Sequence, residues 1–478
     1  MRRNRKVKIL ATLGPASNTA ETISALFVAG ADIFRINMSH ATHEEMRRLV
    51  RLIRNVEAEH GRPIGILVDL QGPKLRIGEF AEGRIPLEIG QKLILDSDPT
   101  PGDKNRVQLP HRDVMESLRP GARVLLDDGR VQLRVIKNAP DQAETEVIAG
   151  SQLSNRKGVS LPDTTLKTSA LTPKDRRDLE AALEEPIDWV AMSFIQRPDD
   201  IAEVRKLARG RVGVLAKIEK PQAVEQLDEI IELADAIMVA RGDLGVEIPL
   251  EQVPGIQKRI TRAGRAAGKP VVVATQMLES MIGAATPTRA EVSDVAGAVF
   301  EGADAVMLSA ESASGEHPVD AVRVMNSIAE AVERDQYYPM IINAQRAEPL
   351  ATGADAITAA ARQIAETLSL AAIVCFTSSG STSMRASRER PTVPILALSP
   401  VRETARRLSL VWGLHCVVSD DVMNIDEMVD RACSVAHNEG FAAPGERIIT
   451  TAGVPFGTPG STNLLRLAFV SPDGHSGM

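Results

Sequence analysis

Charged side chains follow two short apolar runs of the sequence in the same way. The run VLAKIE places Lys217 beside Glu219, and the run AIMVARGD places Arg241 beside Asp243, with 16 residues between the two runs. If the two runs are neighbouring parallel strands, their carboxylates converge at one edge of the sheet. Carboxylate oxygens suit a hard divalent ion such as Mg²⁺, which completes its shell with water and substrate oxygens. The plainer interpretation is that strands leave the core through polar residues.

Eight apolar segments rich in β-branched residues predict the strands that would carry such a site. Near-continuous apolar runs of this length are typical of parallel strands that are buried on both faces. Six of the seven gaps between them hold 16 to 28 residues with a helical pattern. We therefore expect an α/β fold, a (β/α)8 TIM barrel, with strands at residues 8–14, 31–37, 64–70, 189–194, 212–219, 236–243, 270–276 and 305–311.

In a (β/α)8 barrel the functional residues lie at the carboxyl ends of the strands. The residues at these positions are nearly all polar, and several are charged. They are Thr12, Arg35, Asn37, Asp69, Ser193, Lys217, Glu219, Asp243, Thr275, Ser309 and Glu311. The plainer interpretation, that a strand simply leaves the core through polar residues, could explain one strand. It does not explain why polar residues follow all eight strands.

The third gap, residues 71–188, departs from the barrel rhythm. Its first part is not helical, and turn signals separate short strand-like pieces, with RVLLD and RVQLRVI forming an expected hairpin. We interpret residues 73–157 as an inserted small β-barrel domain without helices, which leaves residues 1–72 and 158–340 as the two parts of the large barrel. A domain inserted at the catalytic rim is placed to act as a lid that excludes water.

Two helix starts in the barrel carry capping signals. Thr172 stands three residues before Asp175, the spacing of a capping box, and Pro173 lies between them. Thr286, followed by a proline and by Glu291, fits a second capped start. Both signals support helices between the strands.

A third domain, residues 353–478, follows the polar stretch 341–353. It alternates helical stretches with AAIVCF, VPILALS, HCVVS and ERIITTAG, which predicts an open, mostly parallel α/β sheet. A loop between one strand and one helix has the sequence TSSGST, and its hydroxyls and glycine could form a nest for the phosphate of an effector. The loop residues are Thr377, Ser378, Ser379, Gly380, Ser381 and Thr382. Plain helix capping by Ser381 or Thr382 is an equal alternative.

Length and composition indicate the class of protein. The chain has 478 residues, a formal net charge of −7 and 3% aromatic residues, so nucleic acid is not expected as a partner. Cys375, Cys416 and Cys433 lack metal-type spacing and indicate buried thiols in a reducing cytoplasm. Lys8 interrupts the apolar part of the basic start, and no run is long enough to span a membrane. We therefore expect a cytoplasmic enzyme without a signal segment or a membrane anchor.

With these residues in place, the sequence resembles one family closely, the pyruvate kinases. The resemblance covers almost the whole chain and depends on nine motifs that occur in order near the predicted strand ends. They are ATLGPAS (11–17), FRINMSH (34–40), DLQGPKLR (69–76), NRKGVSLP (155–162), AKIE (216–219), MVARGDLGVEIP (238–249), ATQMLESM (274–281), PTRAEVSDVA (287–296) and MLSAE (307–311). The insert after the third strand corresponds to the mobile lid domain of that family.

The resemblance implies a glycolytic phosphotransferase that moves the phosphoryl group of phosphoenolpyruvate to ADP and gives pyruvate and ATP. Glu219 and Asp243 would hold Mg²⁺ or Mn²⁺, and Lys217 would lie over the same substrate oxygens. Arg35 would grip phosphate through its planar fork. The implied substrate-binding residues are Arg35, Ser193, Lys217, Gly242, Asp243 and Thr275.

The remaining roles also follow from the resemblance. The implied catalytic residues are Lys217, Arg35, Thr275, Ser309 and Glu311, the last two through a water-linked path for the proton. The implied nucleotide-binding residues are Thr12, Pro15, His40, Arg76 and Lys157. A single histidine after a strand is more often a surface or helix-capping residue than a ligand. Only the position of His40 in the motif FRINMSH suggests that it binds the nucleotide.

One departure from the commonest pattern of the family concerns potassium. Many members carry DTKGPEIR where this chain has DLQGPKLR, and an acidic side chain at the position of Lys74 accompanies their bound potassium. The implied region of that monovalent cation contains Asn37, Ser39, Asp69 and Lys74. Because a fixed ammonium can supply the charge of a mobile ion, we expect activity without potassium.

Regulation and assembly are further expectations from the resemblance. The phosphate-binding loop of the family often carries a basic side chain that TSSGST lacks, although Arg385 and Arg388 follow it. We therefore expect AMP or a sugar monophosphate as the effector, rather than fructose 1,6-bisphosphate, and a homotetramer. Two other functions remain open. One is a magnesium-dependent or Schiff-base lyase that uses Lys217, and the other is a non-catalytic sensor of sugar phosphates.

Overall fold

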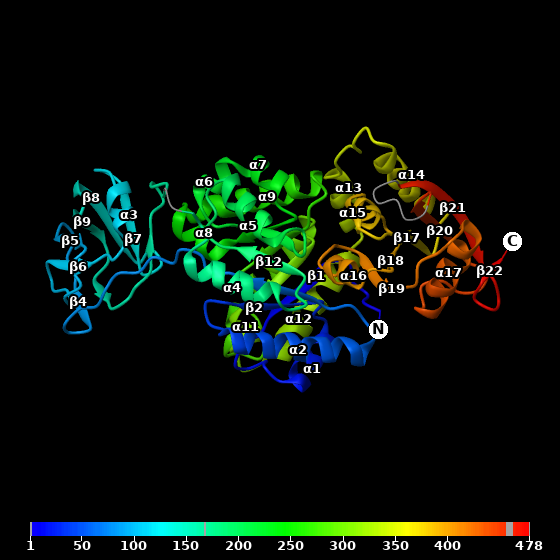
Figure 1. Ribbon diagram of the computed structural model, residues 1–478, viewed down its shortest axis with the longest axis horizontal. Helices are drawn as coiled ribbons and strands as arrows, with labels where there is room; N and C mark the ends of the chain where they lie inside the picture. The colour runs from blue at the N-terminus through cyan, green and yellow to red at the C-terminus, as the bar shows by residue number, and fades with distance from the viewer. Residues whose placement is uncertain (1, 167–168, 456–461, 478) are drawn as a thin grey trace.

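The computed structural model describes residues 2–166, 169–455 and 462–477. Three bodies follow one another along the long axis of the molecule, with the inserted domain at one end, the barrel in the middle and the C-terminal domain at the other end (Figure 1). The N-terminus lies where the barrel meets the C-terminal domain. The insert and the C-terminal domain thus lie on opposite sides of the barrel.

The barrel consists of eight parallel strands in the closed order β1-β16-β15-β14-β13-β12-β3-β2, so the predicted (β/α)8 fold is confirmed. All strands except β2 end one to three residues before the predicted segments do. The strands are β1 (Lys8–Thr12), β2 (Ile33–Asn37), β3 (Gly65–Asp69), β12 (Trp189–Met192), β13 (Gly213–Ile218), β14 (Ala236–Ala240), β15 (Val271–Ala274) and β16 (Ala305–Leu308).

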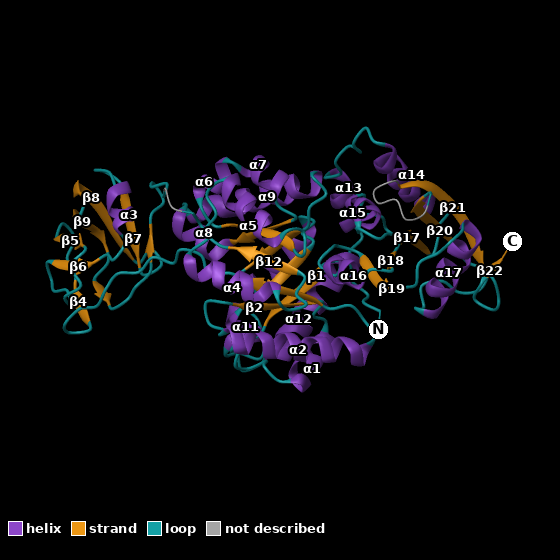
Figure 2. Cartoon of the chain, in the orientation of Figure 1, coloured by secondary structure: helices purple, strands orange, loops and turns teal. Residues whose placement is uncertain are grey.

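Helices surround the barrel on its outer side (Figure 2). Apolar side chains fill both the space between helices and strands and the inside of the barrel, where Leu10, Leu67 and Met238 are fully buried. A packed interior leaves the strand ends as the place for polar groups. The helices are α1 (Ala20–Ala29), α2 (His43–His60), α4 (Pro173–Leu183), α5 (Pro198–Ala208), α6 (Pro221–Glu225), α7 (Leu227–Leu233), α8 (Arg241–Glu247), α9 (Val253–Ala266), α10 (Arg289–Phe300), α11 (Ala310–Ala313) and α12 (Pro318–Arg334), with short 3-10 turns at Leu250–Gln252 and Glu279–Ile282.

Of the two predicted helix caps, one is confirmed and one is wrong. Thr172 caps α4 in a capping box with Asp175. For α10 the cap is Thr288, not Thr286, and Thr288 forms the capping box with Glu291. The reason is the spacing, because a capping side chain reaches the N–H of the third residue after it, and Thr286 lies five residues before Glu291.

The insert contains a six-stranded sheet in the order β11-β7-β8-β9-β5-β6 and a two-stranded sheet of β10 and β4. The predicted hairpin is present as the antiparallel pair of β7 and β8. The prediction of an insert without helices is wrong, since Arg112–Ser117 forms α3, a segment too short to show a helical period. The sheet also continues past residue 157, because β11 pairs with β7. The strands are β4 (Arg84–Pro86), β5 (Lys92–Asp96), β6 (Arg106–Gln108), β7 (Arg123–Leu126), β8 (Val131–Ala139), β9 (Gln142–Ala149), β10 (Gln152–Ser154) and β11 (Val159–Ser160).

The C-terminal domain has the predicted open α/β sheet, with strand order β19-β18-β17-β20-β21-β22. The four predicted strands are parallel, whereas β21 and β22 run antiparallel to their neighbours and were not predicted. The strands are β17 (Ala372–Phe376), β18 (Ile395–Ser399), β19 (Leu414–Val418), β20 (Arg447–Gly453), β21 (Thr462–Val470) and β22 (Ser476–Gly477). The helices are α13 (Tyr338–Ala344), which occupies the start of the predicted linker, α14 (Gly353–Thr367), α15 (Ser381–Arg388), α16 (Arg402–Leu408) and α17 (Ile425–Asn438).

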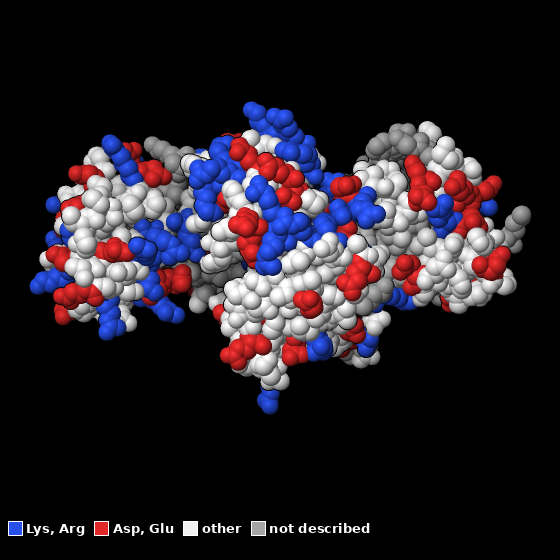
Figure 3. All heavy atoms as spheres, turned by 60° about the horizontal axis from the view of Figure 1, so that its bottom comes forward, with Lys and Arg blue, Asp and Glu red and all other residues white. Residues whose placement is uncertain are grey.

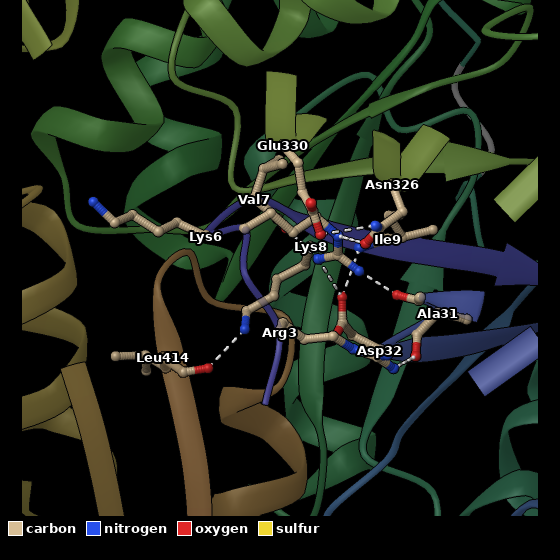
Figure 4. A network of polar contacts seen from close by, with 12 residues as sticks. Arg3, Lys6, Val7, Lys8, Ile9, Ala31, Asp32, Asn326, Glu330 and Leu414 are labelled. Atoms are coloured by element: carbon tan, nitrogen blue, oxygen red, sulfur yellow. Dashed lines mark hydrogen bonds and ion pairs between the residues drawn. The ribbon is translucent and has the colours of Figure 1, made fainter. Parts of the chain in front are cut away.

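Buried charges join the barrel to the C-terminal domain. The ammonium of Lys8 donates to the carbonyl of Leu414 at 2.6 Å, close to a network around Asp32 (Figure 4). A second contact is the buried ion pair of Arg406 on α16 with Glu57 on α2, at 2.5 Å. Removing one partner of such a pair leaves an uncompensated buried charge, so these contacts fix the two domains against each other.

Two further predictions concern the chain as a whole. No helix among the described residues is long and apolar enough to cross a membrane. The three cysteines are buried and free, as expected.

Candidate active site

Three charged side chains lie together where strands β3 and β13 end at the mouth of the barrel. The ammonium of Lys217 lies 2.7 Å from Oε1 of Glu219 and 3.4 Å from Oδ1 of Asp69. It also donates to the hydroxyl of Ser193 at 2.7 Å. All four residues are buried. The structure thus brings together four residues that the sequence placed at three different strand ends.

Arg35 extends this cluster to strands β1 and β2. Its Nε donates to Oδ2 of Asp69 at 2.7 Å, and another guanidinium nitrogen donates to the hydroxyl of Thr12 at 3.1 Å. Thr12 in turn donates to the carbonyl of Leu308 on β16. The guanidinium is therefore held rigidly beside the Lys217 cluster, with a planar fork suited to phosphate oxygens.

The charged groups of the cluster shift one another's pKa values. Burial would raise the pKa of Asp69, but Lys217 and Arg35 outweigh it and lower that pKa. Burial would also lower the pKa of Lys217, yet Asp69 and Glu219 together raise it, so the ammonium stays protonated. Burial raises the pKa of Glu219 to about 7, with Lys217 opposing and Asp243 adding to the shift. Glu219 is thus a buried carboxylate that needs further positive charge to stay ionised.

Glu219 and Asp243 fit a divalent ion. One oxygen of Glu219 accepts the N–H of Phe194 at 2.7 Å, whereas Oε1 is buried and makes no hydrogen bond, its contact with Lys217 being an ion pair. Asp243 is exposed in the first turn of α8, directly after β14, and its charge acts on both Glu219 and Lys217. The described residues contain no group of three or more acids, histidines or cysteines that could hold a metal. Two carboxylates with substrate oxygens completing the shell match the way Mg²⁺ is usually held.

Thr275 lies in a strained turn at the end of β15. Its φ is +71°, in the left-handed region that a β-branched residue rarely adopts. Its hydroxyl accepts the N–H of Gly242 at 2.8 Å and donates to the carbonyl of Ala274. Gly242 was expected to bind the substrate. In this structure its N–H instead donates to the hydroxyl of Thr275.

Arg241 has no role predicted from the sequence, and the structure shows one. One guanidinium nitrogen lies 2.6 Å from a carboxylate oxygen of Asp294 on α10. Another donates to the carbonyl of Thr275 at 2.7 Å and to that of Gln276 at 3.2 Å. Arg241 therefore holds the strained turn that presents Thr275. The sequence feature that could have indicated this role is the position of Arg241 directly before Gly242 at a strand end.

A second pair that the sequence analysis missed lies directly after Glu219. The ammonium of Lys220 forms a buried ion pair of 2.5 Å with Glu247, at the end of α8. This pair ties the end of β13 to the helix that carries Asp243. The sequence gives little indication of this ion pair, because Lys220 and Glu247 are far apart along the chain and lysine and glutamate are both common residues.

Ser309 and Glu311, expected on the proton path, lie at the end of β16. The carboxylate of Glu311 accepts the N–H of Ser309 at 2.7 Å and the N–H of Leu278 at 3.2 Å, so it braces two neighbouring loops. The hydroxyl of Ser309 is buried and has no hydrogen-bond partner among the described residues. Of the two, only Ser309 has a side chain with an unused polar atom.

The residues expected to bind the nucleotide come from two domains, the barrel and the insert. Thr12 is the last residue of β1 and Pro15 lies in the turn after it, where Gly14 passes so close to α11 that a Cβ would lie 2.6 Å from the carbonyl of Ala313. His40 is exposed after β2. Arg76 and Lys157 belong to the two crossings into the insert, where Arg76 donates to the carbonyl of Arg156 and Lys157 pairs with Asp127 at 2.7 Å. The structure brings Thr12 to Arg35 but ties Arg76 and Lys157 to the insert.

The residues expected around a monovalent cation have unequal surroundings. Asp69 is buried in the Lys217 cluster. Asn37 accepts the N–H of Ser39 through its side chain. Lys74 is exposed, its backbone N–H donates to the carbonyl of Gly72 at 2.8 Å, and its ammonium has no hydrogen bond or ion pair with the described residues. Its ammonium is therefore free to meet a ligand.

The predicted effector loop begins α15, and the alternative of plain capping is wrong. The N-cap is Gly380, with φ at +92°, and no side chain caps the helix. Thr377 accepts the N–H of Gly380, and Thr382 bonds with Thr462, so both of these hydroxyls are used internally. Ser378 and Ser379 are exposed, and Ser381 is half-buried.

A closed (β/α)8 barrel with a protonated lysine, a clamped arginine and three carboxylates at its strand ends defines an enzyme class that handles anionic, phosphorylated substrates. Residues 4–322 match the family model of the pyruvate kinase barrel domain, and residues 355–468 match that of the pyruvate kinase alpha/beta domain. The chain therefore belongs to the pyruvate kinase family and is a phosphotransferase enzyme.

Individual relatives agree with this assignment over nearly the whole chain. A pyruvate kinase of Methylorubrum extorquens is 60% identical over 471 residues, which are 98% of each chain. A pyruvate kinase of Agrobacterium vitis is 48% identical and covers 98% of this chain and 99% of its own length. Among solved structures, a pyruvate kinase from Cryptosporidium parvum has a TM-score of 0.92 at 32% identity and covers 98% of this chain and 96% of its own.

Membership of the pyruvate kinase family speaks against both alternatives, the magnesium-dependent or Schiff-base lyase and the non-catalytic sensor. A Schiff-base lysine needs a lowered pKa to act as an amine nucleophile, whereas the pKa of Lys217 is raised. A sensor without catalysis would have no reason to retain the cluster of Lys217, Asp69 and Glu219. Family membership and geometry therefore point to the same class of enzyme.

Proposed function

We propose that this enzyme transfers the phosphoryl group of phosphoenolpyruvate to ADP, giving pyruvate and ATP, with the Lys217 cluster as its catalytic centre. The observation that carries the proposal is the protonated ammonium of Lys217, 2.7 Å from both Glu219 and Ser193 at the barrel mouth. A fixed cation at this point stabilises charge that develops on the transferring group and on the enolate oxygen.

Glu219 and Asp243 would hold the Mg²⁺ or Mn²⁺ that the family implies. A bound divalent ion supplies charge neutralisation for phosphoryl and enolate oxygens. The position of the two carboxylates supports this assignment, because Glu219 directly follows β13, Asp243 lies in the first turn of α8 after the neighbouring strand β14, and the charge of Asp243 acts on Glu219.

The remaining residues orient the substrates. Arg35, held by Asp69 and Thr12, is placed to grip the phosphate of phosphoenolpyruvate. Thr275 and the start of α8 would receive the substrate carboxylate, and Ser193, whose hydroxyl accepts from Lys217 at 2.7 Å, would contact the substrate beside that ammonium. Ser309 has an unused buried hydroxyl and is a candidate member of the water-linked path to the enolate carbon. Thr12, Pro15 and His40 from the barrel, with Arg76 and Lys157 from the insert, would bind ADP.

The insert would act as a lid over this centre. Residues on both its connections, Arg76 and Lys157, are among those proposed for ADP, so movement of the insert would bring them toward the barrel mouth. Excluding water is necessary because water would compete with ADP as the phosphoryl acceptor.

We further propose that the enzyme is cytoplasmic, forms homotetramers and responds to AMP or a sugar monophosphate at the loop 377–382. The absence of side-chain capping at α15 supports a ligand at this loop, because the first N–H groups of a helix attract anions.

The test of the catalytic centre is Lys217→Met in an assay coupled to lactate dehydrogenase. Removal of a preorganised cation lowers turnover on the order of 10² to 10³-fold or more. The matched control is Lys206→Met, an exposed lysine on α5, which should keep full turnover. Normal turnover in a folded Lys217→Met protein would exclude the proposed role.

The test of potassium independence uses Lys74. The exposed ammonium would supply the charge that potassium supplies in other members, so the wild type should be equally active in potassium and in tetramethylammonium salts. Lys74→Glu should lower the activity in tetramethylammonium and restore a response to potassium. Lys104→Glu, an exposed lysine of the insert, makes the same charge change elsewhere. A large stimulation of the wild type by potassium would contradict the proposal.

A further inference from the structure

Two pairs of charged side chains bridge the same two elements at the barrel mouth. Glu219 and Lys220 are consecutive residues after β13. Asp243 and Glu247 lie four residues apart on α8, the helix that follows the neighbouring strand β14. Positions four residues apart lie one turn apart on the same face of a helix. The ion pair of Lys220 and Glu247 therefore lies beside the two proposed metal ligands.

This ion pair is buried and isolated from other charges that could replace either partner. The ammonium and the carboxylate lie 2.5 Å apart, and the two side chains are 11% and 2% exposed. Each side chain has the other as its only hydrogen-bond or ion-pair partner among the described residues. The ammonium also lies 6.0 Å from the centre of the Phe194 ring, a weak cation–π contact. Lys220 and Glu247 thus compensate each other's charge.

Burial distinguishes this pair from the ion pairs of the surface. On the face in Figure 3, lysine and arginine side chains lie among aspartate and glutamate side chains, where water screens their attraction. Lys92 and Glu144 of the insert form a pair of the same residue types at the same 2.5 Å, but Lys92 is 70% exposed. Because the pair at the mouth is shielded from water, its attraction is stronger and holds α8 against the end of β13.

The two proposed metal ligands act in the opposite direction. Glu219 is buried, and the charge of Asp243 acts on it unfavourably. Neighbouring carboxylates repel each other until a cation lies between them. In the enzyme without metal, the repulsion between Glu219 and Asp243 would therefore push α8 away from the end of β13.

Glu219 itself is fixed on its other side. Its Oε2 accepts the N–H of Phe194 at 2.7 Å, and Phe194 has a φ of +56°. The ring of Phe194 lies close to Gly72, where a Cβ would be 2.9 Å from the Cδ2 atom of the ring. Since Glu219 is held in this way, the separation of the two ligands depends on the position of α8.

The last turn of α8 also faces the insert. A Cβ on Gly129, in the hairpin turn between β7 and β8, would lie 3.9 Å from Cγ1 of Val246. Movement of the proposed lid would therefore act on α8 directly beside Glu247. An attachment at this turn keeps Asp243 in place while the insert moves.

We infer that Lys220 and Glu247 are positioning residues that hold the two metal ligands at the separation required by a divalent ion. Their attraction opposes the repulsion between the ligands, so the site is arranged before the ion binds. Both residues act through Glu219 and Asp243, and neither is itself a ligand. The inference rests on the proposed metal site and adds the residues that set its affinity.

The signs of two substitutions separate positioning from an effect of charge through space. If only charge mattered, Lys220→Gln would remove a cation that repels the metal and would tighten Mn²⁺ binding, whereas Glu247→Gln would weaken it. If the ion pair positions the ligands, both substitutions break it and both weaken binding, by roughly 10 to 10²-fold, as is typical of partners that orient metal ligands. Electron paramagnetic resonance of free Mn²⁺ measures the dissociation constant in the full-length enzyme without substrates.

Matched variants control for the substitutions themselves. Lys220→Arg keeps a cation that can meet Glu247 and should bind Mn²⁺ nearly as the wild type does. Lys92→Gln and Glu144→Gln break the surface pair of the insert and should leave the dissociation constant unchanged.

The coupled assay gives an independent measurement. The half-saturating Mg²⁺ concentration should rise in both Lys220→Gln and Glu247→Gln, whereas kcat at saturating Mg²⁺ should change little. The reason is that a bound ion itself draws the two carboxylates together, so only the arrangement before binding depends on the ion pair.

Weaker Mn²⁺ binding in both Lys220→Gln and Glu247→Gln, with wild-type binding in the matched variants, supports the inference. Opposite signs, or an unchanged dissociation constant in both folded variants, overturn it. The proposed metal site still stands in that case if Glu219→Gln weakens binding. A wild type that binds no Mn²⁺, or binding that Glu219→Gln does not alter, overturns the metal site and the inference together.

A second variant covers the case in which one buried charge alone prevents folding. In the double variant Lys220→Gln with Glu247→Gln, the two amides can bond to each other without charge. Its Mn²⁺ binding should still be weaker than that of the wild type, because a neutral hydrogen bond opposes the repulsion less than an ion pair does. Unchanged Mn²⁺ binding in this double variant overturns the inference.

Discussion

The ammonium of Lys217 lies between two buried carboxylates, and this arrangement decides the chemistry of the centre. Without Lys217, burial would favour the neutral forms of Asp69 and Glu219. With it, Asp69 has a lowered pKa and anchors Arg35, while Glu219 keeps an oxygen without a hydrogen bond. One lysine therefore supports the phosphate clamp on one side and the proposed metal ligand on the other.

Arg241 gives a prediction at this scale. Arg241→Lys cannot reach Asp294 and the carbonyls of residues 275 and 276 together, so the strained turn should relax and move the hydroxyl of Thr275. Because small displacements near a reacting centre are costly, we expect kcat to fall on the order of 10 to 10²-fold. The KM for ADP should change little. Steady-state kinetics measure both values.

Asp294→Asn provides the graded comparison for this prediction. It removes the charge of one contact and leaves the two carbonyl contacts of Arg241 intact, so its loss of kcat should be smaller than that of Arg241→Lys. Equal turnover in the wild type and in Arg241→Lys would show that the turn needs no such support.

At the scale of elements, the position of each functional residue depends on where a strand stops and a helix starts. β13 and β14 are neighbours in register, so Glu219 and the start of α8 meet at the same edge. The cap of α10 works in the same way, because Glu291 also accepts from the backbone and hydroxyl of Ser280 in the loop after β15. Caps thus hold the loops of the mouth as well as the helices.

The two threonines before α10 give a matched pair for a prediction. Thr288→Ala should destabilise the first turn of α10 by about 1 kcal/mol, because the hydroxyl caps the N–H of Glu291. Thr286→Ala should cost less than about 0.5 kcal/mol, as expected for a surface position away from such features. Amide hydrogen exchange over residues 289–292 measures the local opening, which should be roughly fivefold faster in Thr288→Ala alone. Equal acceleration in both variants would contradict the assignment of the cap.

For the whole molecule, the junction between barrel and C-terminal domain contains more buried charge than a simple contact would need. Lys8, Asp32, Glu57 and Arg406 are all buried there. Burial and the charges of Arg62 and Lys8 also act on His415 in β19, which contacts Glu439 at 2.9 Å. The junction is therefore sensitive to any change in protonation.

Because His415 is buried, we expect the folding stability to decrease as the pH falls. Burial, against the opposing contact with Glu439, lowers the pKa of His415 from 6.5 to about 4. The unfolded chain therefore binds a proton more readily between pH 6.5 and 4, and folding stability falls as the pH falls through this window. The full effect is about 3 kcal/mol.

The measurement compares thermal unfolding of the wild type and His415→Gln between pH 4 and 6.5. The wild type should lose stability on acidification relative to the variant, whose amide can keep a polar contact with Glu439 but does not titrate. Parallel stability curves for the two proteins would contradict the prediction.

The strands, their order along the chain and the residues of the Lys217 cluster can all be predicted from the amino-acid sequence alone. Buried parallel strands are near-continuous apolar runs, and in a (β/α)8 barrel polar residues after such runs must meet at one end. Lys217, Glu219, Arg35 and Asp69 lie together at the mouth, as this rule predicts. Short or non-local features failed: a helix of six residues in the insert, the antiparallel strands β21 and β22, and the cap of α10.

The folded structure is needed to show which charged side chains are neighbours and which polar atoms have no hydrogen-bond partner. No sequence spacing connects Arg241 with Asp294, Lys220 with Glu247, or Arg406 with Glu57, because these pairs form between elements that the fold brings together. Pairing and burial are properties of surfaces in contact, and a linear pattern records only the residues that each surface carries.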